Sequence, residues 1–124
     1  MVFKKLEDIE VWRRGCRLAV EIYKLTKTTE FNSDWGLRDQ IRRASVAIPS
    51  NIAEGYGRIS DAEFNRFLII ARGSCMELKT QIHIAHAISY LTKDVADGLI
   101  DECDQIGSML TSLSKYLKKS AKPK

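Results

Sequence analysis

Apolar residues recur every three or four positions along most of this chain, which is the spacing of one buried face of a helix. Four segments carry the pattern and predict helices over residues 8–28, 36–58, 60–91 and 94–118. Two prolines and seven glycines leave little room for strands and turns. The pattern therefore predicts an all-α fold, an antiparallel up-and-down four-helix bundle. We expect one domain over residues 1–118 and a basic C-terminal tail at 119–124.

Local signals mark the ends of the first two helices. Asp8 is the expected N-cap of the first helix, because a short acidic side chain can accept hydrogen bonds from free N–H groups of the first turn. The polar segment Thr29–Ser33 is expected to be a short connection. Ser33 or Asp34 can cap the second helix in the same way.

Three further residues define the second and third helices. Pro49 falls inside the second, where it removes a hydrogen bond and clashes with the preceding turn, so we expect a kink near residues 46–48. Ser60 precedes Glu63 by three positions, the spacing of a capping box at the start of the third helix. Gly73 lies within the third helix at a cost of about 1 kcal/mol, which predicts close approach by another backbone, that of the second helix.

Each predicted helix has one apolar seam that we expect to face the core. The seams comprise Ile9, Trp12, Cys16, Ala19, Tyr23 and Thr26 in the first helix; Leu37, Ile41, Ala44, Ile48 and Ile52 in the second; Leu68, Ala71, Cys75, Leu78, Ile82 and Ala85 in the third; and Val95, Leu99, Cys103, Ile106, Leu110, Leu113 and Leu117 in the fourth.

A polar row adjoins the apolar seam of the second helix, rotated from it by roughly 100°. Such a row usually pairs with a neighbouring helix or subunit, and acids on the third helix could face Arg43 and Arg58. We therefore predict a structural polar network that fixes register within the bundle or across a subunit boundary. Its members are Gln40, Arg43, Asn51, Glu54, Arg58, Glu63 and Glu77.

The alternative interpretation makes this polar cluster an active or ligand-binding pocket. Paired carboxylates beside an arginine could serve acid–base chemistry, but no nucleophile or metal-ligand set accompanies them. The glycines around Tyr56 form too short a loop to cradle a phosphate, and they lack the lysine of a phosphate-binding loop. We therefore predict a protein that is not an enzyme, with no catalytic residues.

Three segments carry a family resemblance: VWRRGCRLAVEIYKLT at residues 11–26, GLRDQIRRASVAIPSNIAEGYGR at 36–58, and SDAEFNRFLIIARGSCMELKTQIHIAHAISYL at 60–91. Together they resemble the proteins encoded in intervening sequences of bacterial 23S ribosomal RNA genes, also called the S23 family. The resemblance implies a small cytosolic four-helix bundle that assembles as a ring-like homo-oligomer, a pentamer where the family has been seen. It implies a link to RNA through genomic setting and no established reaction.

The net charge of +4 depends on the end of the chain. Residues 1–114 hold 15 basic and 16 acidic side chains, so the lysines beyond them account for the positive excess. Basic ridges are nevertheless expected on the outer faces of the first two helices. The candidate nucleic-acid contacts are Arg13, Arg17, Lys24, Arg38, Arg42, Lys115, Lys118 and Lys119. No stacking aromatics are expected, because Trp12, Tyr23, Phe64 and Phe67 fall on core stripes.

Cysteine and histidine spacing gives no sign of a cofactor or metal. Cys16, Cys75 and Cys103 lack paired spacing and lie on apolar seams, so we expect reduced, buried thiols. His83 and His86 have no supporting ligand nearby and are expected to be surface or packing residues. No apolar stretch approaches the roughly 20 residues of a membrane span, and the acids near the N-terminus are unlike a signal peptide. A cytoplasmic protein without membrane contact is expected.

Two functional hypotheses follow. The first is a non-enzymatic homo-oligomer that contacts structured RNA or DNA mainly through phosphates, with several copies of each ridge and tail acting together. The second is a protein-interaction scaffold whose exposed rim docks a partner such as an RNA-processing or mobile-element enzyme. The sequence names neither partner.

Overall fold

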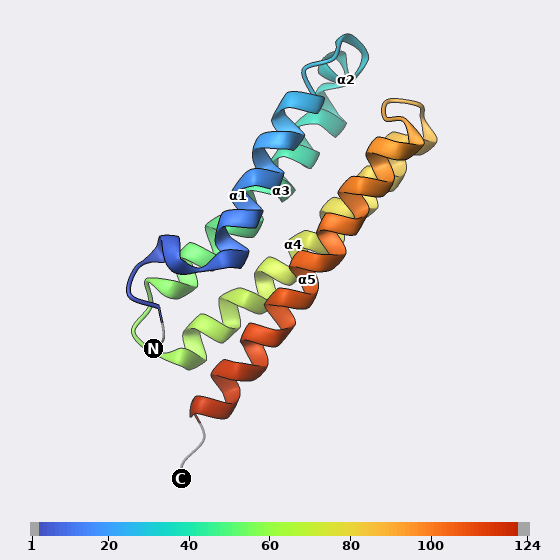
Figure 1. The fold of residues 1–124 in the computed structure, drawn as a ribbon. Helices are drawn as coiled ribbons and strands as arrows, with labels where there is room; N and C mark the ends of the chain where they lie inside the picture. Colours follow the sequence, from blue (N-terminus) through green and yellow to red (C-terminus); the bar gives the residue numbers. More distant parts are fainter. Residues whose placement is uncertain (1–2, 122–124) are drawn as a thin grey trace.

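The computed structural model describes residues 3–121 and is helical throughout that range apart from short connections. Four long helices lie side by side, α1 (Glu10–Leu25), α3 (Trp35–Tyr56), α4 (Asp61–Ala87) and α5 (Lys93–Ala121) (Figure 1). A 3₁₀ turn, η1 (Leu6–Asp8), precedes α1, and a single helical turn, α2 (Thr29–Ser33), lies between α1 and α3. The most extensive packing joins α3 to α4 and α4 to α5, whereas α1 packs mainly on α3.

α3 and α4 make contact at both of their ends. Gly55, near the end of α3, lies against Phe64 and Phe67 near the start of α4. At the other end of the same pair, the carboxylate of Asp34, just before α3, accepts a hydrogen bond of 3.0 Å from the hydroxyl of Tyr90, just after α4. The end of α3 therefore lies beside the start of α4, and the start of α3 lies beside the end of α4.

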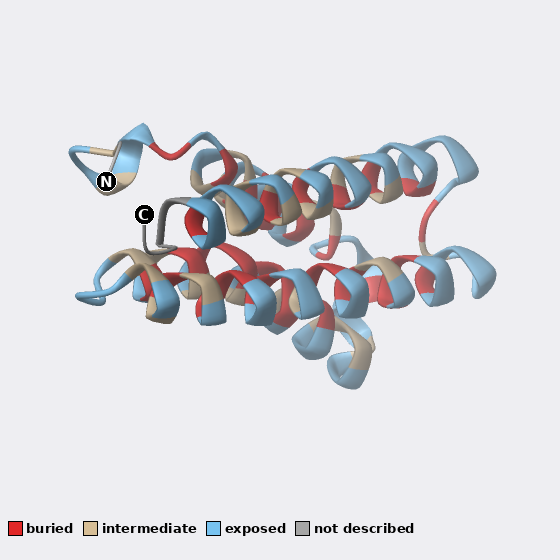
Figure 2. Cartoon of the chain, turned by 90° about the horizontal axis from the view of Figure 1, so that it is seen from below, coloured by how far each residue is buried: buried red, intermediate tan, exposed pale blue. Residues whose placement is uncertain are grey.

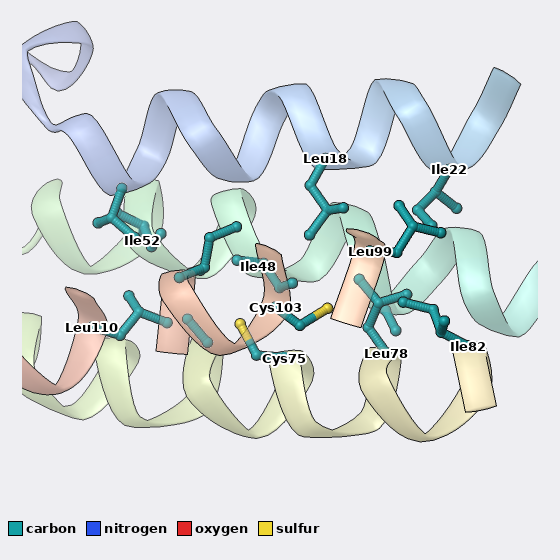
Figure 3. Close-up of a cluster of buried hydrophobic side chains, with 14 of the residues drawn as sticks. Leu18, Ile22, Ile48, Ile52, Cys75, Leu78, Ile82, Leu99, Cys103 and Leu110 are labelled. Carbon is teal, nitrogen blue, oxygen red and sulfur yellow. The ribbon is translucent and has the colours of Figure 1, made fainter. Parts of the chain in front are cut away.

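The core occupies the space between the four long helices, where Figure 2 shows the buried segments in red on facing sides. The seams predicted for α3, α4 and α5 supply most of it, including Ile48 and Ile52, Leu78 and Ile82, and Leu110 (Figure 3). Each fully buried Leu or Ile contributes about 1.5–3 kcal/mol relative to an exposed position. The seam prediction fails at Val95, which is 36% exposed, while Ala96 is buried instead.

The seam predicted for the first helix is buried only in part. Ile9, Ala19 and Thr26 of that seam are buried, and a second stripe one residue away is buried as well. Val11, Gly15, Leu18 and Ile22 face the core, whereas Trp12 and Cys16 are half-buried and Tyr23 is 41% exposed. The cause is Gly15, whose missing side chain lets α3 approach: a Cβ there would lie 3.3 Å from Cδ of Pro49. Both stripes of α1 are apolar, so the sequence pattern alone could not choose between them.

Several helix ends differ from prediction. Asp8 lies in η1, where its carboxylate accepts from the backbone N–H groups of Lys4 and Lys5, and α1 begins two residues later behind Ile9. The connection predicted at Thr29–Ser33 is the helical turn α2, because it buries Phe31. α4 ends at Ala87 rather than Leu91, shortly before Ser89 adopts a φ of 68° that no α-helix accommodates.

Two predicted caps are confirmed. A carboxylate oxygen of Asp34 accepts from the N–H of Leu37 at 3.1 Å, and Ser60 accepts from the N–H of Glu63 at 3.1 Å. The reciprocal half of the capping box is replaced, because the carboxylate of Glu63 bonds Arg66 instead. These caps fix where α3 and α4 begin.

The glycine and proline predictions had mixed outcomes. Among residues 3–121, no other part of the chain comes within 4 Å of a Cβ built at Gly73, so the predicted close approach of α3 is wrong there. α3 and α4 approach closely at Gly55 instead, where a Cβ would lie 2.7 Å from Cβ of Phe67. Pro49 lies inside α3, which continues to Tyr56, and the predicted kink stays a prediction. α5 continues to Ala121, so the first three residues of the predicted tail are helical.

Candidate nucleic-acid interface

The outer face of α1 carries three cations. Arg13, Arg17 and Lys24 are exposed, on the side of the helix opposite Leu18 and Ile22. One guanidinium nitrogen of Arg13 donates to the carbonyl of Glu7 at 2.5 Å. Arg17 and Lys24 form no hydrogen bond with the described part of the chain. The basic ridge of α1 is therefore where the sequence predicted it, and its role in nucleic-acid binding stays a prediction.

Arg38 and Arg42 do not form a second outer ridge. The Arg38 guanidinium donates to the carbonyl and side-chain oxygens of Asn32 at 3.1 and 3.0 Å and to Asp39 at 3.0 Å, leaving the side chain 22% exposed. These bonds tie the turn of α2 to α3. The sequence prediction assumed that an arginine opposite the apolar stripe projects into solvent. It could not foresee that the short connection from α1 to α3 places Asn32 within hydrogen-bonding distance of Arg38.

Arg42 is engaged in the same way with α1. Its Nε donates to the hydroxyl of Thr26 at 2.8 Å, and its guanidinium carbon lies 4.7 Å from the centre of the Tyr23 ring. A cation over an aromatic face is stabilised by about 0.5–1 kcal/mol at an exposed site. Arg42 therefore holds α1 against α3 in this structure rather than projecting into solvent.

The C-terminal end of α5 is the most cationic part of the described chain. Lys115, Lys118 and Lys119 are exposed and make no hydrogen bond or ion pair with residues 3–121. The last twenty residues of the sequence contain five lysines and no acid, although Lys122 and Lys124 lie outside the described residues. Leu110 and Leu117 anchor this end of the helix, since both are 1% exposed.

Elsewhere on the described surface, carboxylates neutralise many of the cations. Arg14 forms a forked pair with Glu102, with N–O distances of 2.6 and 3.0 Å, and this hydrogen bond raises the pKa of the guanidinium. The other pairs are Arg38–Asp39, Arg58–Glu54, Arg66–Glu63, Lys79–Asp104 and Lys93–Asp97. The lysines at the end of α5 are therefore among the cations that remain available to an external anion.

The predicted polar network is not buried within the single chain. Gln40, Arg43 and Glu54 are exposed on α3, Arg58 is exposed just beyond its end, and Asn51 is half-buried with its amide donating to the carbonyl of Ala47 at 2.8 Å. Glu54, in the last turn of α3, and Arg58 form an ion pair of 2.7 Å. Assembly across a subunit boundary, the other half of the prediction, stays a prediction.

The acids predicted on α4 have separate environments. The hydrogen bond and charge of Arg66 lower the pKa of Glu63, with a smaller contribution from the charge of Arg58. Glu77 is exposed and, like Arg43, bonds no residue of the described chain. Nearby on α4, Gln81 is buried, and no group of residues 3–121 donates a hydrogen bond to its side-chain oxygen.

The thiols behave as apolar core groups. Cys75 and Cys103 are 2% exposed, and burial raises the pKa of each to about 12, far above the range in which a thiolate forms at neutral pH (Figure 3). Cys16 is half-buried, and burial also raises its pKa. His83 and His86 are exposed, and residues 3–121 contain no cluster of three or more potential metal ligands.

Sequence reasoning missed Arg72 of α4 as a candidate contact. Arg72 is exposed, bonds no described residue, and lines two hollows between α4 and α5. Lys115 and Lys118 line the second of these hollows. The cations are more than forty positions apart in the chain, so only the packing of α4 on α5 brings them to one groove.

The described part of the chain is thus that of a small all-helical protein whose candidate site is a basic surface on packed helices. Within residues 3–121, no helix is long and apolar enough to cross a membrane. The model of the 23S rRNA-intervening sequence protein family matches residues 7–112, and the chain belongs to that family.

Comparison with solved structures supports the fold. A protein of unknown function from the S23 ribosomal protein family of Bacteroides thetaiotaomicron is similar with a TM-score of 0.79 and 24% sequence identity. The similarity covers 85% of this chain and 98% of that one. No curated protein matches the chain.

Proposed function

We propose that this protein is a non-enzymatic, oligomeric four-helix-bundle module that contacts structured RNA through its phosphates. The observation that carries the proposal is the unpaired lysine cluster at the end of α5, Lys115, Lys118 and Lys119, in a segment without any acid. Lysines that neutralise phosphates release bound counterions, and this term supplies most non-specific affinity. The ridge of α1 offers Arg17 and Lys24 as further phosphate contacts; Lys24, near the end of α1, lies at the opposite end of the bundle from the α5 lysines (Figure 1).

The types of residue in this surface indicate how it would recognise RNA. Lysine and arginine contacts to phosphates fix position and carry no base information, so we expect little sequence preference. One exposed aromatic does lie among the lysines: Tyr116 is 45% exposed and offers a face on which an unpaired base can stack. Contacts of both kinds favour loops and single-stranded segments of a structured RNA over a continuous duplex.

Oligomerisation is part of the proposal, and two separate apolar faces support it. Ile70 and Ile84 on α4, and Ile88 at its C-cap, are 40–46% exposed, although α4 already buries its opposite face. A helix that is apolar on both sides is usually covered on both. Gly73, with open space around it, lies in the same helix.

The second apolar face is a groove of about 430 Å³ between α1 and α3. Every residue that lines it is uncharged, including Trp12, Cys16, Val46, Pro49 and Ala53. Two different apolar faces on one chain suit a head-to-tail contact, which closes into a ring when the rotation permits. We therefore propose a homo-oligomeric ring, a pentamer by family resemblance, in the cytoplasm, where the three unpaired thiols stay reduced.

One titration tests the nucleic-acid proposal. Full-length protein is titrated with a structured RNA of loops and helices across a salt series. Affinity is expected to fall steeply as salt rises, with a slope of about −0.7 to −0.9 on a log–log scale for each phosphate contact. Sedimentation velocity on the same samples reports the assembly state. A 14.1 kDa monomer at micromolar concentration would contradict the oligomer.

The alternative function is a protein-interaction scaffold for an RNA-processing or mobile-element partner. Large exposed apolar side chains at the helix ends favour it, since Trp35 at the start of α3 is 71% exposed and Ile59, beyond its end, is fully exposed. Absence of RNA binding at about 50 mM salt, with the oligomer intact, would eliminate the nucleic-acid function and leave this alternative.

A further inference from the structure

Two hollows lie end to end along the contact between α4 and α5, with volumes of about 550 and 370 Å³. They share Arg72 on the α4 side and Thr111 on the α5 side, so they form one continuous groove, named here the α4–α5 groove. We propose that the α4–α5 groove binds the phosphodiester backbone of a single-stranded nucleic-acid segment. This inference rests on the proposed function and assigns the surface that performs it.

The charge in the groove is positive and largely uncompensated. Arg72, Lys115 and Lys118 line it without any ion pair to the described chain. The only acid in the lining is Asp104, which Lys79 holds at 2.8 Å. Three cations therefore remain for an anion, two on α5 and one facing them from α4.

A row of hydroxyls continues the cationic row along α5. Ser108 and Ser112 line the groove one helical turn apart and form no hydrogen bond with the described chain. Thr111 and Ser114 also line it, but their hydroxyls donate to the carbonyl of Gly107 and to Asn65. Free hydroxyls and cations are the side chains that hold phosphate oxygens along a nucleic-acid backbone.

The dimensions of the groove favour one strand. Its α5 wall extends from Asp104 to Lys118, about 21 Å at 1.5 Å per residue. At about 3.4 Å of rise for each nucleotide of one strand, that wall spans about six nucleotides. Because the axes of packed helices lie only about 8–10 Å apart, the groove between their side chains is narrow and suits one strand rather than a duplex.

The floor of the groove is apolar. Leu68, Ile69 and Leu110 line the end that holds the lysines, and Met76 with the two buried thiols Cys75 and Cys103 lines the other end. An apolar floor between rows of phosphate-binding groups offers contact to sugars and base faces without selecting among bases. The site is thus suited to a strand whose sequence is not read.

The test compares two arginines on α4. Arg72→Gln removes the groove cation, whereas Arg66→Gln removes a cation of equal charge that is paired with Glu63 and does not line the groove. The probes are fluorescein-labelled twelve-nucleotide oligouridylate and a twelve-base-pair RNA duplex, both followed by anisotropy over a salt series. Because both arginines are exposed, thermal melts should match those of the unsubstituted protein.

We expect Arg72→Gln to weaken oligouridylate binding about tenfold, the value of one charge-assisted hydrogen bond, and to reduce the salt slope by about 0.7. Arg72→Lys should restore the slope, and Arg66→Gln should leave both quantities unchanged. Ser108→Ala combined with Ser112→Ala should weaken binding without changing the slope. Affinity for the duplex should be lower and insensitive to Arg72.

Two results would overturn the assignment in distinguishable ways. Unchanged oligouridylate binding by Arg72→Gln, together with loss of binding on neutralising Lys119 and Lys24, would place the nucleic acid outside the groove and leave the proposed function standing. Absence of binding by the unsubstituted protein to either probe would remove the groove and the proposed function together.

Discussion

The two halves of α5 differ in how their charges are used. In the first half, Lys93 pairs with Asp97, Glu102 with Arg14 of α1 and Asp104 with Lys79 of α4. Asp104 is the last acid of the sequence, so the second half contains none. Its lysines at 115, 118 and 119 have no partner in the described chain. The helix dipole favours acids early and lysines late, but each such charge contributes only about 0.3–1 kcal/mol.

The difference indicates a division of roles within one helix. In the first half, Glu102 and Asp104 pair with α1 and α4 and help fix how the helices pack. Charges of the second half stabilise nothing in the described chain beyond the dipole, although the same apolar seam anchors both halves. A rigid helix end that displays unpaired cations is the arrangement expected of a polyanion-binding surface.

The largest effect on stability is expected from the shared apolar seam. Leu99→Ala and Leu110→Ala, one in each half, should each lower the free energy of unfolding by about 2–5 kcal/mol, because both side chains are buried and leave a cavity. Urea denaturation provides the measurement, with half-buried Leu113→Ala as the milder control. A cost below about 1 kcal/mol at Leu110 alone would show that the second half is not firmly docked.

Alkaline pH should affect the seam through the thiols. Burial raises the pKa of Cys103 and of Cys75 to about 12 in the folded state, above the ordinary value of 9.0. The unfolded chain loses these protons first, so stability is complete below about pH 9 and falls by about 1.4 kcal/mol per pH unit for each thiol above it. Cys103→Ala should remove one thiol's share of the slope in denaturation measurements from pH 8 to 10.5. An unchanged slope would contradict the account.

Much of this core could be predicted from sequence, since the apolar seams of α3, α4 and α5 have a single stripe that periodicity identifies. The stripe of α1 could be predicted only in part, because two apolar stripes adjoin and the approach of Pro49 to Gly15 brings the second one into the core. The site was predicted in part. Lys115, Lys118 and Lys119 follow from composition, whereas the engagement of Arg38 and Arg42 and the position of Arg72 depend on tertiary packing.

A smaller effect is expected for the paired charges in the first half of α5. Glu102→Gln should cost about 1 kcal/mol, because the pair with Arg14 is forked but 20–29% exposed. RNA binding should not weaken, since the substitution removes a negative charge. Denaturation and anisotropy on the same preparation separate the two effects. Weaker RNA binding at unchanged stability would contradict the proposed division of roles, because a charge of the first half would then contribute to RNA binding and not to packing.

The smallest effect is expected at Glu54. Its pair with Arg58, just beyond the end of α3, is exposed, so Glu54→Ala should change the stability of a dissociated subunit by no more than about 0.5 kcal/mol. Denaturation below and above the assembly concentration is the measurement. A cost of about 3–5 kcal/mol in the oligomer alone would place the polar network at a subunit boundary, as the sequence predicted.

The salt dependence of RNA binding tests the division of α5 most directly. Lys115→Gln combined with Lys118→Gln is compared with Lys27→Gln combined with Lys93→Gln, a change of the same charge at exposed positions outside the cluster. We expect the first pair of substitutions to reduce the log–log slope by about 1.4–1.8 and the second pair to leave it unchanged. Equal slopes for the two double variants would contradict the claim that the end of α5 holds the phosphates.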